Sequence, residues 1–520
     1  MMNRLHSFRV SRNTATSVSV AASMFMTSAS LLAQESSSNS GQKREVSIVP
    51  RVSITETFTD NVRLSSVGRQ AEQTTEISPG IRILVNGARL KGYFDYSLTE
   101  VVYAQGSSPR RTQNALNTFG TLEAINNWAF VDFNGVISRQ AISAFGNPLI
   151  DNTSVNSNQT EVATYRISPY IRGRFGDLAN YEIRYSRTIT RSDALVGSGV
   201  TTSEAIGRIR GDTAFRNLGW LVDATQQNID YTDGRPTKAD RLSVGMTYTI
   251  TPQLNIFATA GRESNNYTSL DNQSYGTRGF GVRWSPSERT KLSASRDQLS
   301  FGEGHNLNVE HRTARTAWRF SDTKGITTTP AQTGINNLGL NYDILFSQFA
   351  SIEPDPVLRA QLVNAYLQAN GINPNAIATR GFLTTAVTLQ RRQDLLFALL
   401  GVRDTITFIA TRNESRRLDT FSTGVDDLST SSLVRQRGFN VNYAHRLTPH
   451  YSLGVLASQQ NTSGSSALQD TKLRLISVNV TGRVGRKSFA SVGARHAGGN
   501  SGSSGSYVEN SVFANLNVQF

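Results

Sequence analysis

Arginine is the residue type in this sequence best placed to do chemistry. Lys occurs only at positions 43, 91, 238, 291, 324, 472 and 487, so 53 − 7 = 46 of the basic residues are Arg. Between Asn158 and Asp212, the side opposite the apolar residues carries Arg166, Arg172, Arg174, Arg184, Arg208 and Arg210. A guanidinium pairs with carboxylates and phosphates, so these arginines could bind an acidic polymer or small anions. They could equally pair with carboxylates of the same wall, such as Glu182 and Glu204, or with lipopolysaccharide phosphates.

Groups that support catalysis are few. The chain has no Cys, which excludes thiolate nucleophiles, disulfides and Cys-based metal sites. After the first few residues, His occurs only at His305, His311, His445, His450 and His496. No nucleophile elbow, His-rich metal motif or phosphate loop accompanies them. The sequence therefore predicts no enzyme, no cofactor and no metal site.

The N-terminus has the pattern of an export signal. Arg4, Arg9 and Arg12 precede an uncharged stretch from Asn13 to Ala33 that ends in small residues. This pattern predicts a cleaved signal peptide over 1–33. A permanent membrane anchor is the alternative, but Ser and Thr dilute the apolar run. The formal charge of +14 becomes 14 − 3 = +11 without the three arginines. Nucleic acid is not an expected partner of an exported chain.

Alternating apolar and polar residues fill most of the remaining chain. In the stretch VSIVPRVSITETF, Val46, Ile48, Val52, Ile54 and Phe58 share one parity. About twenty such segments follow, which is typical of strands with one apolar face. No window contains 18 consecutive apolar residues, so membrane-spanning helices are not expected.

The connections favour a membrane barrel over a soluble sandwich. Short turns at 86–89, 175–179, 251–253, 285–288, 448–450 and 484–487 alternate with longer polar loops at 60–73, 146–157, 192–200, 265–273, 461–469 and 497–506. Outer-membrane barrels have tight periplasmic turns on one rim and longer external loops on the other. All four tryptophans, Trp128, Trp220, Trp284 and Trp318, are predicted to lie near one rim, as an aromatic girdle requires.

The fold class is therefore all-β, a transmembrane antiparallel up-and-down β-barrel over 34–520. Fourteen strands can be marked from Glu45 to Phe320 and seven from Ala376 to Phe520, and 14 + 7 = 21. Bacterial barrels have even strand numbers, so one assignment is wrong and 20–22 strands are expected. The possible errors are an added strand at Leu338–Phe346, a false strand at 45–59, or a misplaced division within 391–408. A barrel of this width encloses a lumen.

The last ten residues, SVFANLNVQF, have the pattern of a closing strand. Val512, Leu516, Val518 and Phe520 would face lipid, while Asn515, Asn517 and Gln519 would face the lumen. Pairing with the first strand would remove an edge that lipid does not tolerate. A terminal aromatic resembles the signal read by the barrel-assembly machinery, an expected partner.

A segment near 342–371 has helical rather than strand periodicity. Asp355 can cap, Pro356 suits the first turn and Gly371 suits the end. Leu358, Leu362 and Tyr366 form part of an apolar stripe. This small helical insert is either a structural cap over one rim or a gate helix that narrows the lumen. The sequence leaves open which rim carries it.

Three blocks resemble the outer-membrane barrel family associated with PEP-CTERM/exosortase exopolysaccharide systems. They are PRVSITETFTDNVRL at 50–64, the insert at 342–371, and RGFLTTAVTLQRRQDLLFALLGVRDTITF at 380–408. The resemblance implies a porin-like barrel in the outer membrane of a Gram-negative bacterium, in contact with lipid and lipopolysaccharide, that helps exopolysaccharide across. It transfers no active-site residue.

Two functions follow from different classes. The first is transport, through a conduit for an acidic polymer or small anions that serves exopolysaccharide export or biosynthesis. The second is structural, as a barrel without a conducting pore that anchors periplasmic export or synthesis proteins.

Overall fold

Alternating strands of this chain pair into one closed sheet. The computed structural model describes residues 45–147, 150–194, 199–215, 217–232, 234–328, 381–419, 426–502 and 505–520. Across these residues, each of 22 strands pairs antiparallel with the next in sequence, and β1 also pairs with β22. The predicted signal at 1–33, the possible strand at Leu338–Phe346 and the insert at 342–371, with Leu358, Leu362 and Tyr366, lie outside the described residues.

The strands have the following bounds. They are β1 (Glu45–Thr59), β2 (Glu72–Asn86), β3 (Leu90–Tyr103), β4 (Arg111–Ile125), β5 (Ala129–Gln140), β6 (Thr160–Phe175), β7 (Ala179–Ser192), β8 (Gly199–Asp212), β9 (Leu218–Tyr231), β10 (Thr237–Thr251), β11 (Leu254–Asn265), β12 (Gln273–Ser287), β13 (Thr290–Leu299), β14 (Gly302–Arg312), β15 (Thr316–Thr327), β16 (Thr388–Leu400), β17 (Asp404–Arg417), β18 (Leu433–Arg446), β19 (Tyr451–Ser463), β20 (Thr471–Gly485), β21 (Ser488–Ser501) and β22 (Gly505–Gln519). Two short helical turns, α4 (Asp427–Thr430) and η2 (Ala467–Gln469), lie in loops.

The expected 20–22 strands are confirmed, and two of the three uncertain assignments are settled. Residues 45–59 are a strand, and the division within 391–408 falls at 401–403. The sequence indicated fourteen strands between Glu45 and Phe320, but the structure has fifteen that begin in this range, β1 to β15. A strand is easily overlooked at β13 and β14, because only residues 300–301 separate them and the outward residues there include few large apolar side chains.

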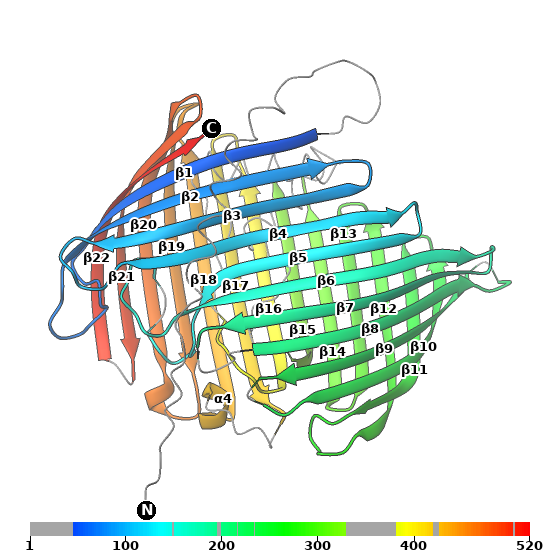
Figure 1. Cartoon of the computed structure of the whole chain (residues 1–520). Helices are drawn as coiled ribbons and strands as arrows, with labels where there is room; N and C mark the ends of the chain where they lie inside the picture. The colour runs from blue at the N-terminus through cyan, green and yellow to red at the C-terminus, as the bar shows by residue number, and fades with distance from the viewer. Residues whose placement is uncertain are drawn as a thin grey trace, which may run out of the picture. The chain divides into compact units, whose positions relative to one another are not determined.

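The two rims differ in their connections, as the sequence predicts. One rim, which we call the short-turn rim, carries connections such as 87–89, 126–128 and 176–178. In two of them, Asn127 and Gly176 have φ near +55°, a conformation that these residue types tolerate. The opposite, long-loop rim carries 60–71, 141–159 and 418–432. The ends of β15 and β16 that flank the undescribed insert also lie at the long-loop rim. In Figure 1, α4 marks this rim at the lower edge of the barrel.

The outward face of the barrel is apolar. Met246 on β10, Phe280 on β12 and Val478 on β20 are each at least 42% exposed and lie in cross-strand register with apolar residues of their neighbours. Trp128, Trp220, Trp284 and Trp318 all lie in or beside short turns. An apolar band with an aromatic girdle is the surface that a bilayer requires. The protein is therefore a transmembrane barrel of the outer-membrane type. No helix among the described residues is long and apolar enough to span a membrane.

Strand β22 closes the barrel against β1. Nine consecutive residue pairs, from Arg51 with Gln519 to Thr59 with Ser511, join the two strands, which lie side by side in Figure 1. Val512, Leu516 and Phe520 are exposed on the outward face, and Val518 shares their parity. On the other face, the Asn515 amide donates to Ser53 and Thr55 of β1. This seam leaves no open sheet edge between the first and last strands.

Candidate functional site

Several loops at the long-loop mouth of the barrel fold inward and pack against the inner wall. We define the loop cap as the described residues of 60–71, 141–159, 381–387 and 426–432. Its members pack on strand residues of inward parity, such as Val101 on β3 and Tyr507 on β22. Because those side chains face the lumen, the loops that contact them lie on the lumen side of the wall.

Four apolar clusters hold the loop cap in place. Their members come from loops and from the inward face of distant strands, and most are under 10% exposed. The clusters are Val62, Val101, Tyr103 and Val155; Leu64, Ile150, Leu473, Leu475, Ala497 and Tyr507; Ala144, Phe145, Phe382, Leu428 and Val434; and Val162, Ala194, Leu383 and Ile142. Burying apolar side chains in this way stabilises a structure by about 1.5–3 kcal/mol for each large side chain.

Backbone hydrogen bonds link the loops to one another. The Val155 amide donates to the Val62 carbonyl at 2.8 Å, and the Leu383 amide donates to the Ile142 carbonyl at 3.3 Å. Tyr103 donates its hydroxyl to the carbonyl of Thr153 at 2.9 Å. Loop 141–159 therefore has defined partners on both another loop and the wall, which is typical of an ordered loop.

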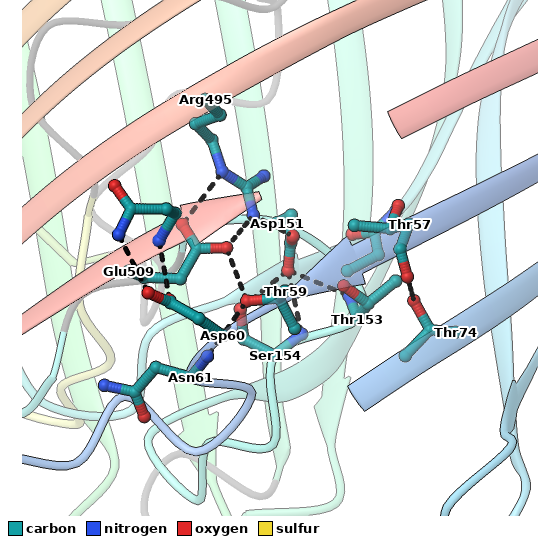
Figure 2. A network of polar contacts seen from close by, with 12 residues as sticks. Thr57, Thr59, Asp60, Asn61, Thr74, Asp151, Thr153, Ser154, Arg495 and Glu509 are labelled. Atoms are coloured by element: carbon teal, nitrogen blue, oxygen red, sulfur yellow. Dashed lines mark hydrogen bonds and ion pairs between the residues drawn. The ribbon is translucent and has the colours of Figure 1, made fainter. Parts of the chain in front are cut away.

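A buried ion network ties the loop cap to the barrel seam. Arg495 on β21 donates to Asp151 of the cap at 2.6 Å and to Glu509 on β22 at 2.8 Å. Thr59, at the end of β1, donates to the same Glu509 oxygen at 2.9 Å. Figure 2 shows Arg495 between the two carboxylates. The side chains of Arg495, Asp151 and Glu509 are only 11%, 19% and 3% exposed, so each charge depends on its partners.

The carboxylate of Asp151 is held in its ionised form. Burial by itself would raise its pKa, but Arg495 and the hydroxyl and amide of Ser154 outweigh burial and lower the pKa to about 2. The Ser154 amide donates at 2.8 Å and its hydroxyl at 2.6 Å to one Asp151 oxygen, while Arg495 binds the other. Asp151 therefore connects its own loop to the wall.

Acidification is expected to loosen loop 141–159. The folded pKa of Asp151 lies below the value of about 3.9 usual for an unfolded Asp. Its contribution to stability is therefore present above about pH 4 and is lost as the pH falls toward 2. The measurement is hydrogen exchange at the Val155 amide, corrected for the intrinsic rate. Exchange should rise across this window in the wild type and change less in Asp151→Asn; equal pH dependence in both would contradict the assignment.

A second carboxylate of the loop cap has the opposite shift. Burial raises the pKa of Asp427 in α4, although Ser143 and the amide of Ala144 donate to it. The pKa of Asp427 therefore moves in the direction that favours its protonated form. The pH dependence of exchange that remains in Asp151→Asn includes the contribution of Asp427, whereas the difference between wild type and this variant reports Asp151.

The six arginines singled out from the sequence lie on the inward wall of β6, β7 and β8. Their parity is opposite to that of Tyr165, Ile183 and Ile209, which are exposed on the outer face. The structure thus brings Arg166, Arg172, Arg174, Arg184, Arg208 and Arg210 to one arc of the lumen.

Part of this arginine wall is neutralised by neighbouring acids. Arg184 lies 2.7 Å from Asp132 and 3.1 Å from Glu182, and its guanidinium stacks 3.8 Å from the centre of the Tyr170 ring. Arg208 pairs with Asp223 at 2.8 Å, and Arg166 lies 3.9 Å from Glu204.

The other three arginines have no ion pair within the described residues. Arg172 stacks over the Phe130 ring at 4.3 Å. Arg174 and Arg210 are exposed on the lumen side, toward the short-turn rim. Carboxylates of the wall thus hold some of the arginines, while others remain open to an anionic solute.

Two of the histidines pair with an aspartate. His305 bonds Asp322 at 2.9 Å and His445 bonds Asp404 at 2.7 Å, and both pairs have outward parity. Among the described residues, no three or more His, Cys, Asp or Glu side chains are grouped to hold a metal ion.

Sequence patterns did not indicate the residues of the loop cap. Residues 146–157 have the composition of an ordinary polar loop, and Arg495 lies among small residues with nothing to show a partner 344 positions away. The inward parity of Arg495 was available from the sequence. Its contact with Asp151 was not, because a loop's docking position depends on the closed barrel.

Similarity to known proteins is found only among solved structures. No protein-family model matches the chain, and no curated protein matches it. The siderophore receptor PirA from Acinetobacter baumannii is similar, with 7% identity and a TM-score of 0.46 over 92% of this chain and 81% of that one. The ferric enterobactin receptor PfeA from Pseudomonas aeruginosa has 9% identity and a TM-score of 0.47 over 92% and 81%. The FrpB iron transporter from Neisseria meningitidis has 9% and 0.46 over 91% and 81%. The fold assignment rests on this chain's own strand pairing.

Proposed function

We propose that this barrel is an outer-membrane conduit for an acidic polymer or small anions, serving exopolysaccharide export. The observation that carries the proposal is the arginine wall on the inward face of β6–β8, in the lumen of a 22-stranded barrel. A barrel of this size encloses space for solute, and unpaired guanidiniums attract anions and repel cations. The polysaccharide is suggested by the sequence blocks at 50–64 and 380–408.

In this proposal the loop cap regulates passage. Its four apolar clusters and the Arg495 network hold loops across the long-loop mouth, so the resting barrel would have a narrow opening. The arginines lie along the wall of the lumen, where a solute would pass before or after the constriction.

Planar-bilayer conductance tests the conduit. We expect the purified full chain to prefer anions, and the triple variant Arg172→Gln, Arg174→Gln, Arg184→Gln to lose most of that preference because the wall loses three positive charges. The matched control is Arg187→Gln with Arg191→Gln, which removes two exposed arginines from the outward face of β7. Anion preference should survive in the control.

Two outcomes would contradict the proposal. If the triple variant kept the anion preference unchanged, the arginine wall would not be the source of that preference. Absence of conductance, even when residues 342–371 are deleted, would exclude the conduit and favour a structural barrel that anchors periplasmic export proteins.

A further inference from the structure

The outer wall across five strands carries an ordered row of polar and basic residues. Cross-strand register places Gln393 of β16 opposite Arg412, Arg412 opposite Arg437, Arg437 opposite Asn461, and Asn461 opposite Lys472 of β20. Their parity is that of Leu395, Phe408 and Phe439, which belong to the outward apolar face. The row lies on the long-loop side of that apolar band.

The charges in this row are not balanced within the described residues. Arg412 and Arg437 are direct cross-strand neighbours, an arrangement that is destabilising for like charges. Arg412 donates to Glu414 at 2.6 Å, and Arg435 lies 3.7 Å from the same carboxylate. Arg437 is exposed and has no ion pair there. Arg412 and Arg435 thus share one carboxylate while Arg437 has none among the described residues, and an anion between Arg412 and Arg437 would relieve their repulsion.

An apolar cavity adjoins these arginines. Its volume is about 540 Å³, and its lining includes Leu395, Phe408 and Phe439, with Arg412 and Arg437 also in the lining. The cavity is open to the outside of the wall rather than enclosed. The positive charge of Arg412 and Arg437 therefore lies nearer the long-loop rim, and the apolar lining by Phe408 and Phe439 lies nearer the middle of the wall.

Basic residues are confined to one side of this wall. On β16 to β20, the outward positions toward the short-turn rim carry residues such as Phe397, Ile406, Val455 and Val480, and no Lys or Arg. In barrels with short periplasmic turns, the long-loop rim faces the cell exterior. The basic row is therefore at the headgroup level of the outer leaflet.

We propose that this wall is a binding site for a phosphorylated glycolipid of the outer leaflet, with the chemistry of the lipid anchor of lipopolysaccharide. A phosphate bridges Arg412 and Arg437, since guanidinium forks bind phosphate through two hydrogen bonds. An acyl chain occupies the cavity beside Phe408 and Phe439. The order of charge and apolar surface along the strands matches the order of phosphate and acyl chain in such a lipid.

Binding to the full chain in detergent micelles tests the site, with bisphosphorylated lipid A as the probe and native mass spectrometry as the readout. We expect Arg412→Gln with Arg437→Gln to lower affinity at least about tenfold, because two charge-assisted contacts are lost. The control is Arg187→Gln with Arg191→Gln on β7, which removes two outward arginines that do not line the cavity. Dephosphorylated lipid A should bind the wild type as weakly as the phosphorylated form binds the double variant.

Further measurements distinguish lipid A from other possible occupants of the site. Inorganic phosphate at the same concentration should not displace lipid A; displacement would show a simple anion site and overturn the proposal. Equal affinity for phosphatidylglycerol, or equal loss in the β7 control, would reduce the site to general charge attraction and also overturn it. A lipid-free dimer broken by the double variant would assign the wall to a second copy instead. If the double variant does not fold, Arg437→Gln alone provides the same comparison.

Discussion

Replacement of Arg495 by Gln is expected to release loop 141–159 from the barrel wall. Among the described residues, the guanidinium of Arg495 is the one cation that pairs with both Asp151 and Glu509, whose side chains are 19% and 3% exposed. Without it, two carboxylates with little access to water face each other. Removing one partner of a buried ion pair costs about 3–5 kcal/mol. We expect this cost to appear as loss of docking rather than loss of the barrel, since the 22 strands retain their hydrogen bonds.

Hydrogen exchange measures the release. The amides of Val155 and Leu383, which donate to Val62 and Ile142, should exchange much faster in Arg495→Gln, while amides in mid-strand of β10 remain protected. Arg495→Lys should give an intermediate result, because it keeps the charge and loses the fork. If the proposed conduit is correct, conductance should also increase. Unchanged protection of Val155 would show that the apolar clusters alone hold the loop.

Replacement of Phe382 by Ala is expected to open a second part of the loop cap. Phe382 is fully buried, beside Ala144, Phe145, Leu428 and Val434. A buried Phe→Ala change costs about 3–5 kcal/mol, through lost transfer energy and the cavity left behind. Because Ala141 pairs with Phe382 in an isolated bridge, loosening of 381–387 should spread into 141–159.

The matched control is Phe257→Ala, which removes the same atoms from an inward-facing residue of β11 that stacks with Arg283 outside the loop cap. Exchange at Leu383 should rise in Phe382→Ala and stay unchanged in Phe257→Ala. Phe382→Leu, which removes fewer buried atoms than Phe382→Ala, should give an intermediate result. An equal response of Leu383 to both Ala variants would mean that the clusters do not act locally.

Much of the wall could be predicted from the sequence because strand periodicity is local. The parity of Val46, Ile48 and Ile54 is enough to assign a face, and a one-residue slip would expose every polar neighbour to lipid. Likewise, the inward parity of Arg172 and Arg184 follows from Ile171 and Ile183. The strand count was uncertain by one, and the alternatives named for it, at 45–59, at Leu338–Phe346 and within 391–408, did not include the hairpin of β13 and β14 with its two-residue connection.

The loop cap could not be predicted, because its contacts join segments distant in sequence. The carboxylate of Asp151 gains its role only where Arg495 reaches it, and Phe382 becomes a core residue only beside α4. No periodicity marks such loops. Helical periodicity instead drew attention to 342–371, a prediction that lies outside the described residues and stays a prediction.

The seam between β1 and β22 also sets an order of assembly. Thr59 and Glu509 are 450 positions apart, so their hydrogen bond forms only when the end of the chain is present. Pairings with such long separation close late, since a large loop must be ordered first. Both wall partners of the ion network, Arg495 and Glu509, belong to the last two strands. The ion network of Asp151 therefore forms only once these last two strands are in place, whereas the cluster of Val62, Val101, Tyr103 and Val155 needs neither strand.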